Sequence, residues 1–400
     1  MTASLSQSGL ELKLQALEQL LKDLTGEVAD EESLRKRLLQ IVEKVAATIR
    51  LPGEYLWRLM VQPHEYAVMR VALELKLPDL LYQKGGCTTA QLAEESRASE
   101  SLIIRLMRSL AAMGVFAETK PQTYKSTPIS DLLAQDEQMS DTVKFMWDVI
   151  EKAVSYLPEY LAQSEHKMVA GTPGAWRLAF GKDTDFFSWI AQERQLMRQF
   201  HNMMAIQRFR RPDWYDVYPV QSNMIARFDL SIGDVLLVDI GGSRGHELQK
   251  FKARFPLAPG RTIVQDLPHV IATATRLETS GIEVMGHDFF TEQPVKGALV
   301  YYMRSILHDW DDEKCRAILR NIVPAMKAGY SRLIINDWVI PDSGALFYPC
   351  MQDINMMALF SGMERSQSQM TDLLDSVGLK IVHLWGSPDT ERCIEAFLPE

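Results

Sequence analysis

The sequence predicts an α/β fold for the C-terminal half of the chain, preceded by a helical region that carries a short hairpin. After about Ser231, short apolar runs alternate with helical stretches, and this order indicates a mostly parallel sheet covered by helices. Before Ser231, apolar side chains recur every three to four positions among charged ones, as in amphipathic helices. A length of 400 residues exceeds what one ordinary core organises, so we expect two or more domains.

The first helical stretches carry apolar stripes that need a partner. Such a stripe packs either within the chain or against a second copy, and we favour the second copy because an N-terminal extension has little of its own to cover. The residues that form the stripes are Leu10, Leu12, Leu14, Leu17, Leu20, Leu21, Leu34, Leu38, Leu39 and Val42.

Residues 63–133 predict three helices followed by a hairpin. Thr88 and Ser99 are suited to cap helices, and Gly114 is suited to end one. Residues 115–118 and 123–126 then resemble the two strands of a wing. A winged helix is a DNA-binding shape, but the heavy apolar load of the would-be recognition helix favours a structural or dimerising role.

The amino-acid composition of the chain indicates which kinds of partner the protein binds. The formal net charge of −9 is a poor match for a protein that binds mainly nucleic acid or an anionic membrane. The four cysteines lie far apart without metal-site spacing, so we expect reduced thiols and no metal. No secretory signal and no bilayer-spanning apolar stretch is visible. We therefore expect a soluble, cytoplasmic protein whose partner is a small molecule.

The middle of the chain, residues 136–230, is helical and rich in aromatic residues and methionine. Core packing accounts for most such residues, but the density also suits a lid over a flat, apolar substrate. The residues concerned are Phe145, Met146, Trp147, Tyr156, Phe186, Phe187, Trp189, Phe200, Met203 and Met204.

The C-terminal region predicts strands at residues 235–240, 262–266, 297–303 and 332–337, and a closing antiparallel hairpin at 378–385 and 393–397. Helices are expected at 246–254 and 312–326. Ligands of open α/β sheets bind at the carboxyl ends of the strands, so the residues at these ends are the candidates for a binding site.

A glycine turn follows the first of these strands. Asp239 lies near the strand end, and Gly241, Gly242 and Gly245 follow it. The pattern is neither the GxGxxG of a dinucleotide binder nor a P-loop, because Ser243 interrupts the first and no lysine with Ser/Thr follows. A carboxylate and a glycine turn without a phosphate cradle suit a nucleoside with a cationic amino-acid tail.

Two further acidic residues extend this prediction. Asp266 ends the next strand, where a carboxylate can hold both ribose hydroxyls. A structural role as the cap of the helix beginning at Leu267 is also open, and the two roles are compatible. Asp288 lies in a loop beside Phe289 and could bind an adenine amino group while the ring covers the base.

His308 follows the strand that ends near Arg304, so its imidazole is expected to face the reactive end of the ligand. A near-neutral imidazole is suited to removing a proton from a phenol or alcohol. Asp337, which ends the following strand, and Glu364 are the acidic candidates to orient the ring. A lone histidine is more often structural, but these two acidic partners favour the catalytic interpretation.

At these positions the chain resembles the small-molecule O-methyltransferases, especially fungal enzymes of secondary metabolism that act on polyketides. The motifs that carry the resemblance are VDIGGSRGH, QDLPHVI, GHDFF, YYMRSILHDWDDEKC, NDWVIP and GMERSQ. The resemblance implies a Rossmann-like methyltransferase sheet at residues 231–400, a winged-helix dimerisation domain at 1–135 and a homodimer. It also implies that each N-terminal region helps to close the site of its partner.

The resemblance also implies site residues. S-adenosylmethionine would be the cofactor and S-adenosylhomocysteine its product, with His308 as general base and Asp337 and Glu364 flanking it. The residues that would contact the cofactor are Asp239, Gly241, Asp266, Leu267, Asp288, Phe289 and Arg304.

Two departures and two rival functions stay open. Residues 366–369 and Ser305 differ from residues common in the family, which puts details of the pocket in doubt.

Some fungal relatives bind S-adenosylmethionine yet catalyse dehydration or pericyclic ring formation, and they replace the motif histidine with a cationic residue. The retained His308 therefore favours methyl transfer. A winged-helix regulator that senses the cofactor is the second rival, and the acidic net charge argues against it.

Overall fold

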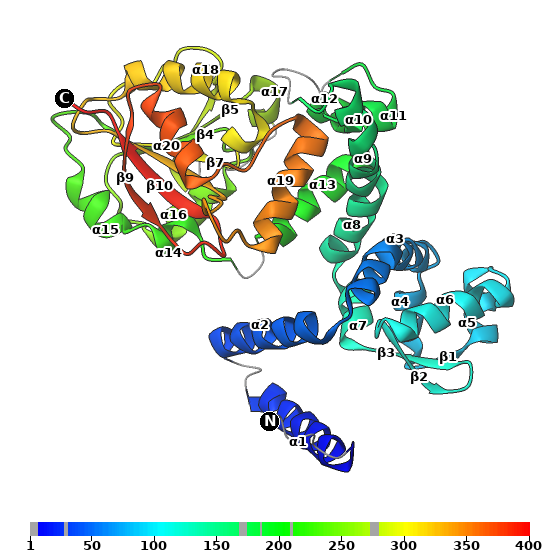
Figure 1. The fold of residues 1–400 in the computed structure, drawn as a ribbon. Helices are drawn as coiled ribbons and strands as arrows, with labels where there is room; N and C mark the ends of the chain where they lie inside the picture. Colours follow the sequence, from blue (N-terminus) through cyan, green and yellow to red (C-terminus); the bar gives the residue numbers. More distant parts are fainter. Residues whose placement is uncertain (1–6, 28–30, 168–173, 185, 209–210, 273–279) are drawn as a thin grey trace. The chain divides into compact units, whose positions relative to one another are not determined.

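The computed structural model describes residues 7–27, 31–167, 174–184, 186–208, 211–272 and 280–400 (Figure 1). The chain forms two compact units, residues 1–69 and 70–400. Among the described residues, no helix is long and apolar enough to cross a membrane.

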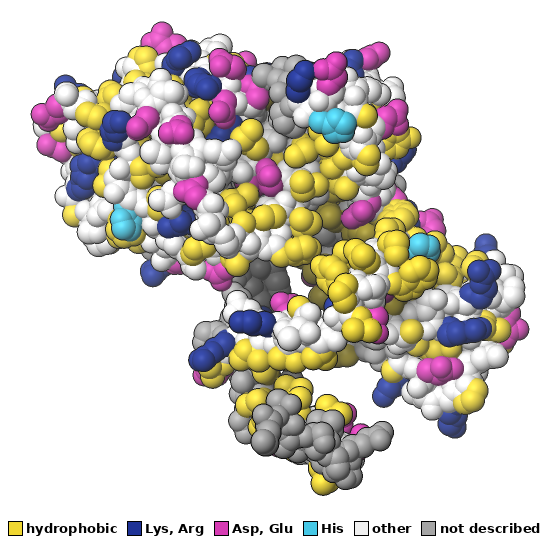
Figure 2. All heavy atoms as spheres, viewed as in Figure 1, with side chains coloured by type: hydrophobic (Ala, Val, Ile, Leu, Met, Phe, Trp, Pro, Cys, Tyr) yellow, Lys and Arg dark blue, Asp and Glu magenta, His cyan; other side chains and the backbone are white. Residues whose placement is uncertain are grey.

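The first unit contains α1 (Gln7–Glu27), α2 (Glu32–Ile49) and the larger part of α3 (Pro52–Glu74). None of the side chains described between residues 11 and 69 is buried. Figure 2 shows hydrophobic side chains in a row along α2. The exposed apolar residues of these helices include Leu14, Leu17, Leu34, Ile41, Val45, Trp57 and Met60.

The second unit begins with the predicted winged helix. It comprises α4 (Leu77–Lys84), β1 (Cys87–Thr88), α5 (Thr89–Ser96), α6 (Glu100–Ala112), β2 (Phe116–Lys120) and β3 (Thr123–Ser126), and its sheet has the order β1-β3-β2. The capping box at Thr88, the cap at Ser99 and the left-handed Gly114 (φ +76°) confirm the predicted boundaries.

Short helices follow, and their aromatic residues pack against one another. They are α7 (Pro128–Gln135), α8 (Glu137–Phe145), a π-helical turn (Met146–Glu151), α9 (Lys152–Ser155), α10 (Leu157–Gln163), α11 (Trp176–Phe180), α12 (Phe186–Gln192), α13 (Arg194–Gln207), α14 (Trp214–Val217) and α15 (Val220–Asn223). Trp176, Phe186 and Trp189 are buried in one cluster with Phe145 and Met203. Core packing therefore accounts for these residues, and a lid over the substrate stays a prediction.

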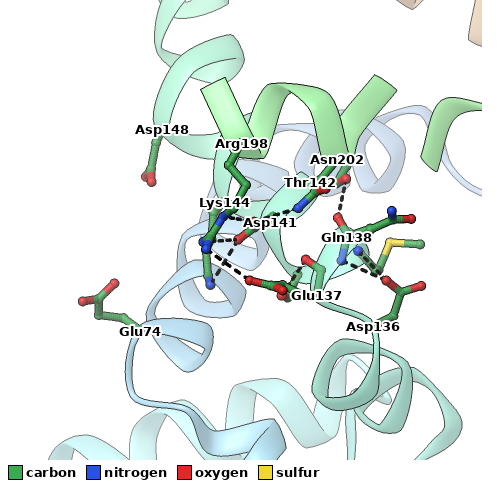
Figure 3. A network of polar contacts seen from close by, with 12 residues as sticks. Glu74, Asp136, Glu137, Gln138, Asp141, Thr142, Lys144, Asp148, Arg198 and Asn202 are labelled. Atoms are coloured by element: carbon green, nitrogen blue, oxygen red, sulfur yellow. Dashed lines mark hydrogen bonds and ion pairs between the residues drawn. The ribbon is translucent and has the colours of Figure 1, made fainter. Parts of the chain in front are cut away.

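A buried carboxylate connects α8 to α13. Asp141 accepts a hydrogen bond from Asn202 at 2.9 Å and pairs with Arg198 at 3.0 Å and with Lys144 at 3.7 Å (Figure 3). The side chain of Asp141 is fully buried, and a buried carboxylate is stable only where such partners compensate its charge.

The main sheet has seven strands in the order β6-β5-β4-β7-β8-β10-β9. The strands are β4 (Val235–Ile240), β5 (Arg261–Asp266), β6 (Ile282–Gly286), β7 (Val300–Arg304), β8 (Arg332–Asp337), β9 (Lys380–Trp385) and β10 (Arg392–Phe397). The first five in spatial order pair in parallel, and the β9–β10 hairpin adds antiparallel to β8. The structure thus confirms the predicted α/β class.

Helices cover both faces of this sheet. One face packs alternate strand residues such as Val238 and Met303 against α18 (Asp312–Ile322) and α20 (Gln367–Asp375). The other face packs Leu237 and Tyr302 against α16 (His246–Arg254) and α14. The described part of this region also contains α17 (Pro268–Ile271) and α19 (Phe347–Phe360).

One strand was missed, and the predicted boundaries of two further elements were wrong by three or more residues. Strand β6 was missed, because this short edge strand mixes exposed and buried positions and lacks a strong apolar run. Strand β7 begins at Val300 and not at residue 297, because Gly297 occupies a left-handed turn (φ +69°). Helix α18 ends at Ile322, four residues early, since Pro324 cannot donate a helical hydrogen bond and residues 323–325 form a 3-10 turn.

Candidate functional site

The predicted acidic residues gather at one edge of the sheet. Asp239, Asp266 and Asp337 lie at the carboxyl ends of β4, β5 and β8, and Asp288 follows β6. Because these strands are parallel neighbours in one sheet, their carboxyl ends meet at the same edge.

The glycine turn after β4 requires its glycines. Gly241 and Gly245 have φ angles of +71° and +74°, a region that side chains disfavour. A Cβ atom on Gly241 would lie 2.5 Å from Cδ1 of Ile306, and one on Gly242 would lie 2.5 Å from Oδ2 of Asp239. The backbone of the turn therefore passes directly against the side chains of Ile306 and Asp239.

Asp239 has a buried carboxylate oxygen in need of a donor. Its side chain is 2% exposed, and among the residues that the structure describes none forms a hydrogen bond to Oδ2. Burial and the charge of Glu247 raise the pKa of Asp239 to about 8. A ligand that brings a cationic ammonium group would compensate this carboxylate.

Asp266 connects the glycine turn to the end of β5. Its Oδ2 accepts a hydrogen bond from Ser243 N at 2.8 Å and its Oδ1 accepts one from Leu267 N at 2.7 Å. Each oxygen keeps a lone pair for another donor, such as a ribose hydroxyl. The alternative that Asp266 caps the next helix is wrong, because Leu267 is the N-cap residue of α17 and no side chain caps that helix.

Asp288 and Phe289 lie beside the same turn. Oδ1 of Asp288 accepts a hydrogen bond from Phe290 N at 2.9 Å, which orders the loop after β6. The Phe289 ring lies 3.8 Å from the position of a Cβ on Gly241 and packs edge-on against Trp310. The edge of an aromatic ring thus lies beside the glycine turn, and its contact with adenine stays a prediction.

Arg304 is engaged by carboxylates of this chain. Its guanidinium pairs with Glu247 at 2.9 Å and with Glu391 at 2.6 Å, and its side chain is 7% exposed. Sequence reasoning missed both acidic partners, since neither lies near Arg304 in the chain. The structure assigns Arg304 an ion-pair role at the end of β7, and its contact with a cofactor stays a prediction.

His308 lies on the 3-10 turn Leu307–Asp309, directly after β7. Its Nδ1 is 2.8 Å from Oε1 of Glu364, so the structure brings this predicted pair together. Its Nε2 is 3.4 Å from Oδ1 of Asp309. Asp309 was not predicted, and its position next to His308 in the sequence was the only available signal.

Asp337 completes an acidic environment around the ring. Its Oδ1 accepts a hydrogen bond from Ser305 N at 2.7 Å. Burial lowers the pKa of His308, but the charges of Glu364, Asp309 and Asp337 outweigh that effect and raise the pKa well above 6.5. Burial in turn raises the pKa of Asp337 to about 7, against the opposing charge of His308.

Sequence comparison identifies the family. Residues 160–380 match the O-methyltransferase domain, and residues 57–136 match the O-methyltransferase dimerisation domain. The chain belongs to the O-methyltransferase family. Its curated relatives include O-methyltransferase penC of Penicillium thymicola, which is 34% identical over 94% of this chain and 93% of the relative. Another is demethylsterigmatocystin 6-O-methyltransferase of Aspergillus parasiticus, which is 31% identical over 96% of this chain and 98% of the relative.

Solved structures extend the comparison. LepI in complex with SAM has a TM-score of 0.85 and 28% identity, over 98% of this chain and 100% of that one. OxaC has a TM-score of 0.80 and 26% identity, over 96% and 99% of the two chains. Another LepI structure and another OxaC structure contain SAH. A further solved structure, described as a pericyclic reaction enzyme, has a TM-score of 0.84 and 28% identity over 98% of this chain and 100% of that one.

S-adenosylmethionine is the cofactor of this O-methyltransferase, and the residues present fit it. The uncompensated carboxylate of Asp239 suits the ammonium of the methionine tail, and the lone pairs of Asp266 suit the ribose hydroxyls. The individual contacts of Gly241, Gly242, Gly245, Asp266, Leu267, Asp288 and Phe289 with the cofactor stay predictions.

Replacing Asp266 should weaken cofactor binding. We expect Asp266→Ala to raise the dissociation constant of S-adenosylmethionine about 10- to 100-fold, since a hydrogen-bonding charged group is lost. Titration calorimetry measures this constant. Asp229→Ala is the matched control. Asp229 also accepts a backbone hydrogen bond, but it precedes β4 and lies on the side of the amino ends of the strands. Equal affinities in the two variants would contradict the role of Asp266.

Proposed function

We propose that the protein transfers the methyl group of S-adenosylmethionine to a phenol, enol or alcohol oxygen of a polyketide-like secondary metabolite, with His308 as general base. The observation that carries the proposal is the 2.8 Å contact between Nδ1 of His308 and Glu364. This contact directs the Nδ1 proton to Glu364, so that the lone pair of a neutral ring lies on Nε2.

The cofactor and the residues of the site have separate roles in the proposed reaction. The bound cofactor supplies an electrophilic methyl group. Nε2 of His308 accepts the proton of the substrate hydroxyl group, which replaces Asp309 as the neighbour of this nitrogen. The positioning of substrate and cofactor supplies much of the remaining rate enhancement. The carboxylates of Glu364 and Asp337 stabilise the imidazolium that forms.

The named relatives support the substrate class. Demethylsterigmatocystin 6-O-methyltransferase methylates an oxygen according to its name, and it aligns with nearly the whole of this chain. The His308–Glu364 pair at the strand edge supplies the base that an unactivated hydroxyl needs.

One observation favours a second candidate function, pericyclic or dehydration chemistry without methyl transfer. The raised pKa of His308 favours the imidazolium, which donates a hydrogen bond to a carbonyl and cannot accept a proton. The similarity to a pericyclic reaction enzyme, with a TM-score of 0.84 and 28% identity, is consistent with this alternative.

One experiment distinguishes the two functions. Purified protein is incubated with S-adenosylmethionine and candidate polyketide phenols and alcohols, and mass spectrometry follows substrate and cofactor together. Methyl transfer yields a product heavier by one methyl group and an equal amount of S-adenosylhomocysteine. We expect His308→Ala to keep cofactor affinity and to lower turnover by about two to four orders of magnitude. An isomerised or dehydrated product with unconsumed cofactor, or an unimpaired His308→Ala variant, would contradict the proposal.

We also propose that the chain is a homodimer in which residues 1–135 form the dimerisation domain, residues 136–230 the substrate lid and residues 231–400 the cofactor-binding domain. The support is the match of residues 57–136 to the dimerisation domain and the lack of buried side chains among those described from 11 to 69. Exposed apolar faces of this extent mark interfaces between proteins.

Substitutions that introduce negative charges on α3 should weaken the dimer. Trp57 and Met60 are 68% and 58% exposed and lie one helical turn apart, so we expect Trp57→Glu with Met60→Glu to raise the dimer dissociation constant at least about tenfold. Analytical ultracentrifugation measures it, with Gln62→Glu and His64→Glu on the same helix as the control pair. A wild-type protein that sediments at 45.5 kDa, the mass of one chain, would contradict the dimer.

A further inference from the structure

A buried arginine follows Glu364 directly in the chain. The side chain of Arg365 is 1% exposed, although a guanidinium is among the groups most costly to remove from water. The charge is compensated by Asp312 in the first turn of α18, whose Oδ1 accepts hydrogen bonds from Nε at 3.0 Å and from Nη2 at 2.9 Å.

The remaining donors of Arg365 bind the backbone around His308. Nη1 donates to the carbonyl oxygen of Leu307 at 2.8 Å, and Nη2 donates to the carbonyl oxygen of Trp310 at 2.9 Å. These two residues precede and follow the His308–Asp309 pair on the 3-10 turn. The guanidinium therefore spans the turn that carries His308.

Residues 362 and 363 contact the same turn. Met363 N donates to the carbonyl oxygen of His308 at 2.9 Å. A Cβ on Gly362 would lie 2.1 Å from that oxygen, so only glycine allows the two backbones to approach so closely. Four consecutive residues thus hold one histidine: Gly362, Met363 and Arg365 contact its turn, and Glu364 contacts its ring.

We propose that Arg365 is a positioning residue, which holds the Leu307–Trp310 turn in the conformation that places the His308 ring against Glu364. The inference rests on the proposed role of His308 as general base. Arg365 acts on the His308 ring through the backbone carbonyls to which it donates its hydrogen bonds.

The geometry explains why arginine is needed. A planar guanidinium offers five donors in a fixed fork and reaches two carbonyls and a carboxylate together. The lysine ammonium is a single point on a flexible chain, so Arg365→Lys keeps the charge but cannot hold both ends of the turn. A displacement of about 1 Å at a reacting group can lower turnover about 100-fold.

Arg365→Lys tests the proposal, and Arg332→Lys is its matched control. Arg332 is also buried and also donates to backbone carbonyls, in its case those of Gly329, Tyr330 and Ser331, but it begins β8 and lies at the amino end of that strand, away from His308. Three quantities are measured in both variants: turnover, the cofactor dissociation constant, and the titration of His308 by nitrogen-15 histidine NMR, with the signal assigned by His308→Asn.

We expect Arg365→Lys to lower turnover about 10- to 100-fold and to leave the affinity for the cofactor within about twofold of the wild-type value. We also expect His308 to titrate at lower pH, because its contact with Glu364 loosens. Arg332→Lys should lower only the melting temperature. If Arg365→Lys is too unstable to study, Asp312→Asn removes the charge that fixes the guanidinium and should produce smaller changes of the same sign.

The inference would be overturned if Arg365→Lys changes neither turnover nor the titration of His308. The same criterion applies to Asp312→Asn where that variant is used instead. Equal losses of turnover in Arg365→Lys and Arg332→Lys would also overturn it, since they would indicate general destabilisation. A shifted titration with unchanged turnover would confirm the positioning role and contradict the proposed function of His308 as base.

Discussion

The position of the His308 ring depends on a carboxylate that the chain supplies 56 residues later, at Glu364. The two residues meet because β7 and β8 are parallel neighbours and the segment after α19 returns to the carboxyl edge of the sheet. Gly362 permits the close approach of the two backbones. Sheet topology, a glycine and a buried arginine therefore all act on one ring-to-carboxylate contact.

The same edge of the sheet concentrates buried carboxyl groups. Asp239, Asp337 and Glu364 are each at most 3% exposed, and each has one carboxylate oxygen without a hydrogen-bond partner among the described residues. An unpaired buried carboxylate oxygen is costly. In the proposed function, the ammonium and sulfonium groups of the cofactor and the imidazolium of His308 would compensate these carboxylates.

Much of this site could be predicted from local sequence. The turn at Asp239–Gly245, the strand-end position of Asp266 and the pairing of His308 with Glu364 follow from spacing and from a family resemblance. Contacts between distant residues could not be predicted: the pairing of Arg304 with Glu391, and that of Arg365 with the carbonyls of the His308 turn, arise only when the sheet forms. Strand β6 was missed because an edge strand needs no continuous apolar run.

The pH dependence of kcat/KM tests the central claim that carboxylates hold His308 as a base. In the proposed mechanism the neutral ring is the active form. Glu364 raises the pKa of His308 above 6.5, so activity should fall as the pH falls through that raised value. Glu364→Gln removes the charge and should move the acid limb to lower pH while lowering the maximum rate. An acid limb at or below pH 6.5 in the wild-type enzyme that Glu364→Gln does not move would contradict the account.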